Sequence, residues 1–258
     1  MKRRILVSLV AALVAVAMAV PVSAITDGEL DGDDHPYVGL MVASIGGAPQ
    51  WRCSGTLLDS THFLTAGHCT SGADHVEIWF DADVESGIPG NGYPFTGDVG
   101  GTPYTHPDYD DNAFFLADLG MVVLDEPVVM SGYGALPAQD VIDGFKRGKK
   151  TTFTAVGYGL QLINPVFVQA ERVRMVATPH LIMKNVPGFT GDFSILLSNN
   201  HSTGGTCFGD SGGPNFIGDT NVIGGVTSFG INGNCAGTGG VYRIDRADDL
   251  AWLATFGF

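Results

Sequence analysis

Residues 207–214, with the sequence CFGDSGGP, constrain this chain more than any other stretch. Their glycines predict a tight turn around Ser211, because glycine adopts backbone conformations that other residues avoid. Such a turn presents the serine hydroxyl to a substrate and leaves the flanking backbone N–H groups free to point at it. A lone serine is a weak nucleophile, so the pattern also requires a base and a group that orients the base.

Two upstream segments offer the missing groups. The segment LTAGHC contains His68, and the segment ADLGMVVL places Asp118 at the start of an apolar strand. Other aspartates compete with it on composition alone: Asp110, Asp111 and Asp125. Asp118 is preferred because its apolar strand predicts a buried, low-dielectric setting, which an orienting carboxylate needs.

The order His68, Asp118, Ser211, together with TAGHC and CFGDSGGP, resembles the trypsin/chymotrypsin family of serine endopeptidases. The resemblance implies an all-β fold of two antiparallel β-barrels with the site between them and a helix at the C-terminus. The N-terminal barrel is expected over about residues 25–135 and the C-terminal barrel over about residues 145–258. The 37 glycines and the short apolar segments also favour many strands joined by turns.

The connection between the barrels is expected within the glycine-rich, polar segment 132–150. For the C-terminal helix, Asp245 is the predicted cap. The apolar positions that follow it have i, i+3, i+4, i+7 spacing and predict the buried face: Ala247, Leu250, Ala251 and Ala254.

Residues 1–24 have the organisation of a secretory signal peptide. A basic start precedes an apolar run over residues 5–20, and small residues end the segment at Ala24. The run is shorter than the roughly 20 residues that span a bilayer, which disfavours an uncleaved anchor. We therefore predict a secreted protein without a membrane partner once the signal is removed.

Charge excludes another class of partner. Removal of residues 1–24, with three basic and no acidic residues, changes the formal net charge from −14 to −17. So acidic a protein is a poor ligand for nucleic acid. The acidic residues between Asp27 and Asp34 predict a solvated loop.

The four cysteines of an exported chain predict two disulfides, and the residues alone leave three connectivities open. The chain contains no CxxC pair, so a zinc site made by the four cysteines is not expected. The family resemblance implies Cys53–Cys69, beside the histidine segment, and Cys207–Cys235, beside the nucleophile loop. A third disulfide near the pocket of animal members has no counterpart here.

The resemblance also implies an activation mechanism. Cleavage after Ala24 would make Ile25 the first residue, and its amino group would pair with Asp210 and hold the oxyanion loop in shape. Signal peptidase itself would then activate the protein. The alternative cleavage signal Ala17-Met18-Ala19 would leave a short propeptide.

By the same resemblance, Ser211 is the nucleophile, His68 the general base and Asp118 the group that orients His68. The backbone N–H groups of Gly209 and Ser211 form the oxyanion hole. The pocket for the residue before the scissile bond is expected at Gly205, Thr206, Ser228, Phe229, Gly230 and Gly240.

Gly205 stands where trypsin-like enzymes carry an aspartate, so the expected pocket is open and uncharged. Such a pocket favours a large apolar or aromatic residue before the cut. His201 would instead favour acidic substrates if it faced the pocket, although a surface position is expected for it. The sequence Asn200-His201-Ser202 is also a glycosylation sequon.

The resulting expectation is a monomeric serine endopeptidase that acts on proteins or peptides and needs no cofactor or metal. Asp81, Asp83 and Glu85 form a weaker candidate for calcium, which prefers oxygen ligands. The alternative function is a catalytically silent, secreted binding protein on a protease scaffold.

Overall fold

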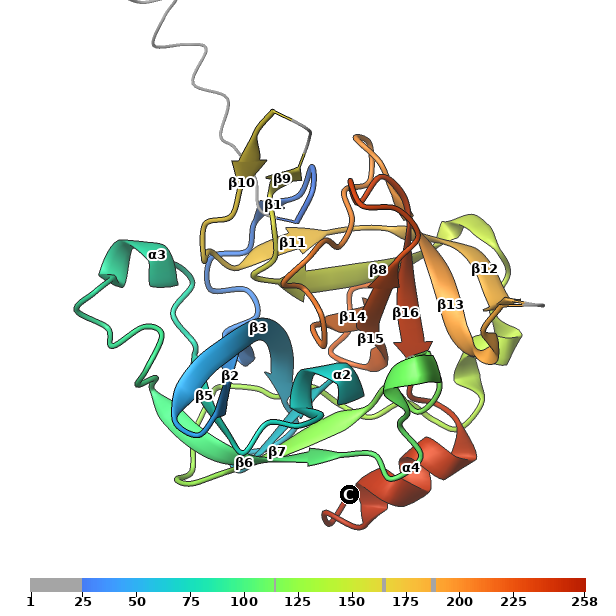
Figure 1. The fold of residues 1–258 in the computed structure, drawn as a ribbon. Coiled ribbons are helices and arrows are strands. Elements are labelled where there is room, and N and C mark those ends of the chain that lie inside the picture. Colours follow the sequence, from blue (N-terminus) through green and yellow to red (C-terminus); the bar gives the residue numbers. More distant parts are fainter. Residues whose placement is uncertain (1–24, 114, 164–165, 187–188) are drawn as a thin grey trace, which may run out of the picture.

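The computed structural model describes residues 25–113, 115–163, 166–186 and 189–258, so the predicted signal peptide lies outside the described residues. Two antiparallel β-barrels lie beside each other, one from the first half of the chain and one from the second (Figure 1). This confirms the predicted fold class.

The first barrel closes with the strand order β2-β3-β4-β7-β6-β5. Its strands are β2 (Val38–Ile45), β3 (Ala48–Leu57), β4 (His62–Thr65), β5 (His75–Trp79), β6 (Val99–Thr105) and β7 (Gly120–Leu124). Residues 38–44 of β2 are all buried, because β2 pairs with β3 on one edge and β5 on the other and its two faces are both covered.

The second barrel has the order β8-β12-β13-β16-β15-β14, and pairing of β14 with β8 closes it. Its strands are β8 (Gly148–Gly157), β12 (His180–Val186), β13 (Gly191–Asn199), β14 (Pro214–Ile217), β15 (Ile223–Gly230) and β16 (Gly237–Arg243). Two short strands, β1 (Glu29–Leu30) and β11 (Met175–Ala177), belong to the same sheet, and β9 (Leu162–Ile163) and β10 (Val168–Gln169) form a separate two-stranded sheet. Although β1 comes first in the chain, it pairs with β11 and so extends the second sheet.

The segment between β7 and β8 connects the barrels and contains the short 3-10 helix η2 (Val141–Gly144). A second 3-10 helix, η1 (Asp111–Ala113), and two short helices, α2 (Gly67–Thr70) and α3 (Val84–Gly87), lie within the first half. The helix α4 (Ala247–Ala254) follows β16 and lies below the barrels in Figure 1.

The helix α4 confirms the predicted C-terminal helix, but its predicted cap and buried face are wrong. Asp245 accepts hydrogen bonds from Ile142 N and from Arg243, and Arg246 occupies the N-cap position. The side of α4 that packs inward carries one buried carboxylate and two large apolar side chains, Asp249, Trp252 and Leu253, and Phe256 packs inward just after the helix ends. These bury more apolar area than the small residues of the predicted face, so packing decides the orientation.

The acidic segment near the N-terminus is exposed except at Asp31, where the prediction of a solvated loop is wrong. Arg174 is also buried, and its Nε lies 3.0 Å from Asp31 Oδ2. His35 Nδ1 lies 2.5 Å from the other carboxylate oxygen. Burial alone raises the pKa of Asp31, but His35 and Arg174 together lower it below its usual value.

Ser54 on β3 connects the barrels. Its hydroxyl donates to Gly209 O at 3.0 Å and accepts from Tyr158 N at 3.0 Å, and its backbone N–H donates to Ser211 O at 2.8 Å. One residue of the first barrel therefore fixes both the end of β8 and the 207–214 loop of the second barrel.

We expect Ser54→Ala to lower the free energy of unfolding by about 2–4 kcal/mol, because it leaves the buried Tyr158 N–H and the Gly209 carbonyl without this partner. Denaturant unfolding followed by fluorescence measures the loss. Ser71→Ala, which removes only a long surface hydrogen bond to Asp111, should cost less than about 0.5 kcal/mol. Equal unfolding midpoints for Ser54→Ala and the unmodified protein would contradict the assignment.

Candidate active site

His68 lies in the short helix α2, at the side of the first barrel that faces the second. The disulfide Cys53–Cys69 joins α2 to β3. Gly67 permits the close approach of α2 to the segment before β7, because a Cβ there would lie 3.0 Å from Leu119 N. The helix is thus fixed on both sides of the histidine.

Asp118 is fully buried, and its carboxylate accepts hydrogen bonds from both barrels. His68 donates from its backbone N at 2.8 Å, and its ring Nδ1 lies 3.0 Å from each carboxylate oxygen. Ser228 Oγ, from β15, donates to Oδ2 at 2.5 Å. A carboxylate in this position favours the Nδ1–H tautomer of His68, which leaves Nε2 as the base.

The acidity of His68 reflects two opposing effects. Burial lowers the pKa of the imidazole, but the charge of Asp118 and its hydrogen bond raise the pKa more, so the net direction is upward from 6.5. An imidazolium formed at this position is therefore stabilised by Asp118.

Ser211 lies in the loop after the disulfide Cys207–Cys235. Gly209 and Gly212 have φ angles of 98° and 78°, in the left-handed region that glycine adopts without strain. A Cβ on Gly212 would also collide with Thr65 Oγ1. Within the described part of the chain, the Ser211 hydroxyl makes no hydrogen bond, and a serine–histidine bond often shortens only when substrate binds.

The backbone around Ser211 offers two N–H donors. Among the described residues, the N–H groups of Gly209 and Ser211 have no acceptor, whereas those of Asp210, Gly212 and Gly213 donate to backbone carbonyls. Leu160 N donates to Phe208 O at 2.8 Å. Because the N–H and C=O of a trans peptide point in opposite directions, this bond turns the Gly209 N–H away from Leu160.

Asp210 is fully buried behind this loop. Its carboxylate accepts from Gly159 N at 2.7 Å and Cys207 N at 2.8 Å. Burial raises the pKa of Asp210 to about 7 in spite of these bonds and of the charge of Arg52. A cation placed next to this buried carboxylate would stabilise its charged form and would interact with it strongly.

Ile25 is buried and packs with Val173, Met175 and Ala177. The next residue, Thr26, accepts a hydrogen bond from Gly205 N at 3.1 Å. The predicted mature start is therefore packed against the segment that leads to Cys207. In this chain Ile25 is joined to Ala24 and its nitrogen is an amide, so the predicted ion pair with Asp210 stays a prediction.

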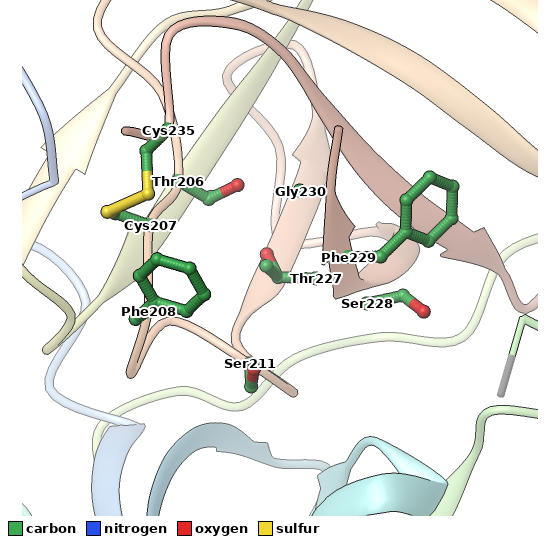
Figure 2. Close-up of a pocket in the computed structure, with 9 residues that line it drawn as sticks. All are labelled: Thr206, Cys207, Phe208, Ser211, Thr227, Ser228, Phe229, Gly230 and Cys235. Carbon is green, nitrogen blue, oxygen red and sulfur yellow. A yellow bond between two sulfur atoms is a disulfide. The ribbon is translucent and has the colours of Figure 1, made fainter. Parts of the chain in front are cut away.

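A pocket of about 170 Å³ opens beside Ser211 (Figure 2). It is lined by Thr206, Cys207, Phe208, Ser211, Thr227, Ser228, Phe229, Gly230 and Cys235, none of which is charged. The lining includes four of the six residues expected there. Figure 2 shows the disulfide Cys207–Cys235 on one side of the pocket and the Phe229 ring pointing away from this disulfide.

The other two expected residues lie outside this lining. Gly205 packs against the side chain of Asn199, and Gly240 lies under the ring of Phe229. Gly239 lies next to the lining residue Thr206, since a Cβ there would lie 2.9 Å from Thr206 Oγ1. A β-bulge between Thr227 and Phe229 shifts the register of β15 against β16, and Phe229 lies opposite Gly240.

Other sequence candidates lie elsewhere. The His201 side chain is 95% exposed and pairs with Asp27 at 2.8 Å, away from the pocket. His106 is buried, with its ring against Trp252. Burial lowers the pKa of His106.

Two of the three calcium candidates, Asp83 and Glu85, already have protein partners. Asp83 accepts from Ser86 N at 2.9 Å, and Glu85 forms an ion pair with Arg172 at 2.7 Å. An ion bound there would have to replace these contacts. Among the described residues, the one close group of metal-ligand types is His68 with Cys53 and Cys69, whose sulfurs are already joined in a disulfide.

Two contributions to the site were missed in the sequence. Ser228 was expected only as a pocket residue, yet its hydroxyl donates to Asp118. Ser54 was not expected at all, although it binds the backbone of Gly209 and Ser211. A serine within an apolar strand carries little information about function in the sequence, because its hydrogen-bond partners on the other barrel are known only from the structure.

Comparison with known proteins identifies relatives. The family model Trypsin matches residues 30–250. Brachyurin from Leptuca pugilator is 32% identical over 200 residues, which cover 71% of this chain and 77% of brachyurin. Chymotrypsin from Phaedon cochleariae is 29% identical over 238 residues, covering 85% of this chain and 77% of the relative.

Solved structures show the same fold. The structure titled HL collagenase has a TM-score of 0.71 at 20% identity and covers 90% of this chain and 98% of its own. Human heparin binding protein has a TM-score of 0.68 at 18% identity, with 91% and 98% covered. At these identities the match concerns the fold alone.

We expect Asp118→Asn to lower the pKa of His68, because burial would then act without the opposing carboxylate charge. A histidine-ring NMR titration measures the shift. His106, whose pKa is governed by burial, Asp108 and Asp248, provides the internal control and should titrate unchanged. A pKa of His68 that stayed the same or rose would contradict the proposed source of its basicity.

Proposed function

Because this chain belongs to the trypsin family of serine endopeptidases, we propose that His68, Asp118 and Ser211 are its catalytic triad. The observation that carries this proposal is the buried Asp118 carboxylate, bonded to both the backbone N and the ring Nδ1 of His68. The same carboxylate raises the pKa of the imidazole. These contacts support His68 as a base oriented for the neighbouring barrel, which carries Ser211.

The reaction follows from these roles. Nε2 of His68 takes the proton of Ser211 Oγ as the oxygen attacks the peptide carbonyl carbon, and a tetrahedral oxyanion forms. When the C–N bond breaks, the imidazolium returns that proton to the leaving amine. Water, deprotonated in turn by His68, then hydrolyses the acyl-enzyme ester and releases Ser211. Each step uses protein groups and water, so the mechanism requires no cofactor.

The oxyanion is proposed to accept hydrogen bonds from the N–H groups of Gly209 and Ser211. The absence of other acceptors for these donors within the described residues supports this role. Such a donor contributes roughly 3–4 kcal/mol of transition-state stabilisation. The contacts of Ser54 and Leu160 with this loop fix the donors before substrate arrives.

For the residue before the scissile bond, we propose a preference for apolar or aromatic side chains. The lining of the pocket beside Ser211 is uncharged and includes Phe208 and the disulfide Cys207–Cys235. An apolar side chain can enter this pocket and leave water without burying an unpaired charge of the pocket. A Lys or Arg side chain would find no carboxylate in the lining.

Export of the protein belongs to the same proposal. Both disulfides form in the structure, as expected for a protein of an oxidising compartment. No helix among the described residues has the length and apolar character needed to cross a membrane. The proposed substrates are extracellular proteins or peptides.

The rival function, a silent binding protein, uses the same fold, as the match to human heparin binding protein illustrates. Fold alone therefore does not separate the two. The specific observation against the rival is that all three triad residues and the free N–H donors are present together in this chain.

A peptide library varied at the residue before the cut tests the proposed activity with protein that begins at Ile25. We expect cleavage after Phe, Tyr or Leu, with Ser211→Ala reducing kcat by at least about 10³-fold. A serine-reactive phosphonate should label the unmodified protein but not Ser211→Ala. Cleavage after Lys or Arg would keep the triad and contradict the pocket assignment, whereas neither cleavage nor labelling would favour the silent scaffold.

We expect the free amino group of Ile25 to control activity through Asp210. Protein that retains Ala24 should lose about 100-fold or more in kcat/KM relative to protein that begins at Ile25, because a buried carboxylate without its ammonium partner is destabilised by several kcal/mol. Edman sequencing verifies each N-terminus, and a form that begins with Val in place of Ile25 serves as the active control. Equal activity with and without Ala24 would exclude the ion pair as a requirement.

A further inference from the structure

Arg52 lies against the loop that carries the nucleophile. It belongs to β3, and its side chain is half-buried. A Cβ added to Gly209 would lie 3.2 Å from Arg52 Nε, so the guanidinium packs beside this glycine of the nucleophile loop. On its other side, Arg52 Nη1 donates to Ala170 O at 3.3 Å.

This guanidinium has no carboxylate ion pair among the described residues. The nearby Arg172 differs, since it pairs with Glu85 at 2.7 Å and its guanidinium lies over the ring of Tyr93 at 5.0 Å. Asp210 attracts Arg52, but its two carboxylate oxygens accept backbone hydrogen bonds from Gly159 and Cys207. In a chain with a formal net charge of −14, a half-buried cation that forms no carboxylate ion pair among the described residues can bind an incoming anion.

Burial and the neighbouring cation Arg172 favour an anion beside Arg52, which Glu85 and Asp210 also attract. Burial lowers the pKa of the guanidinium, the Tyr93 hydroxyl opposes that effect, and the positive charge of Arg172 lowers the pKa further. Both the burial and the neighbouring cation disfavour the isolated charge, so a carboxylate placed beside Arg52 would relieve both. Arginine remains charged throughout the physiological range and presents donors that match a carboxylate.

The position of Arg52 assigns it to one side of the scissile bond. It does not line the pocket proposed for the residue before the cut, and every residue of that lining comes from the second half of the chain. Arg52 instead precedes Cys53, whose disulfide holds Cys69 beside His68. His68 is the group that protonates the leaving amine, so this side of the site faces the part of the substrate that leaves.

We propose that Arg52 is a specificity-determining residue that binds a carboxylate on the leaving side of the substrate. The inference rests on the proposed function and deepens it. The carboxylate is either the side chain of an acidic residue after the cut or the terminal carboxylate of a short leaving peptide. The enzyme would thus combine an uncharged pocket before the cut with an anion site after it.

The test uses quenched fluorescent peptides with one common sequence before the cut, chosen from the library above. In one series the second residue after the cut is Glu, Gln or Lys, and the C-terminus is amidated. In the other series the leaving dipeptide is neutral and ends as a free acid or an amide. The first series reports an acidic side chain, and the second reports a terminal carboxylate.

We expect kcat/KM for the preferred carboxylate peptide to exceed that of its Lys or amide counterpart about 10-fold, as for a charge-assisted hydrogen bond. Added salt should reduce the ratio, because ions screen a partly exposed pair. Arg52→Gln should bring the ratio within about 2-fold, and Arg52→Glu should invert it. Arg147→Gln, which removes the same charge from an exposed position directly before β8, should retain the ratio of the unmodified protein.

Efficient cleavage with equal rates for all leaving groups would overturn the anion site and leave the proposed protease function intact. A preference that Arg52→Gln retained in full would overturn the role of Arg52. Absence of any cleavage would overturn the proposed function and the inference together. The ratio and its salt dependence come from the unmodified protein, so the proposal can fail even if an Arg52 variant does not fold.

Discussion

Burial of the Asp118 carboxylate is the constraint on which the rest of the site depends. A carboxylate removed from water is strongly destabilised unless hydrogen-bond donors surround it. Asp118 obtains donors from α2 through His68 and from β15 through Ser228. These elements belong to different barrels, so the charge is satisfied only when the barrels are assembled. Orientation of His68 is therefore a consequence of correct packing between the two halves.

The nucleophile loop depends on the same interface. Ser54 reaches from the first barrel to Gly209 and Ser211 in the second, while Leu160 holds the Phe208 carbonyl. Left-handed backbone at Gly209 and Gly212 permits this path, and a side chain at Gly212 would collide with Thr65. The proposed oxyanion donors are thus positioned by contacts that lie outside the 207–214 motif. Preorganisation of this kind avoids a reorganisation cost during the reaction.

The arginines of this protein fall into two groups according to whether an aspartate pairs with them. Arg174 and Arg243 are fully buried, and each is neutralised by aspartates, Asp31 for the first and Asp245 for the second. Among the residues that the structure describes, Arg52 has no such ion pair, and it lies beside the nucleophile loop, where we propose that a substrate binds. In an acidic protein this difference gives one cation a role in recognition, while the buried cations stabilise the fold.

The sequence by itself determined the two-barrel fold, the C-terminal helix, both disulfides and the candidate nucleophile, base and orienting carboxylate. The candidate site residues follow from short local motifs. The two-barrel fold and the pairing of the cysteines were implied by the family resemblance that these motifs carry, because the residues alone left three connectivities open. Only the tertiary structure decided that Ser54 and Ser228 complete the site, that Gly240 lies against the Phe229 ring outside the pocket lining, and that α4 packs Trp252 and Leu253 inward. The burial of Asp31 was decided in the same way. Each of these depends on strand register or on a partner far along the chain, and such long-range contacts leave no periodic or motif signal at the residues themselves.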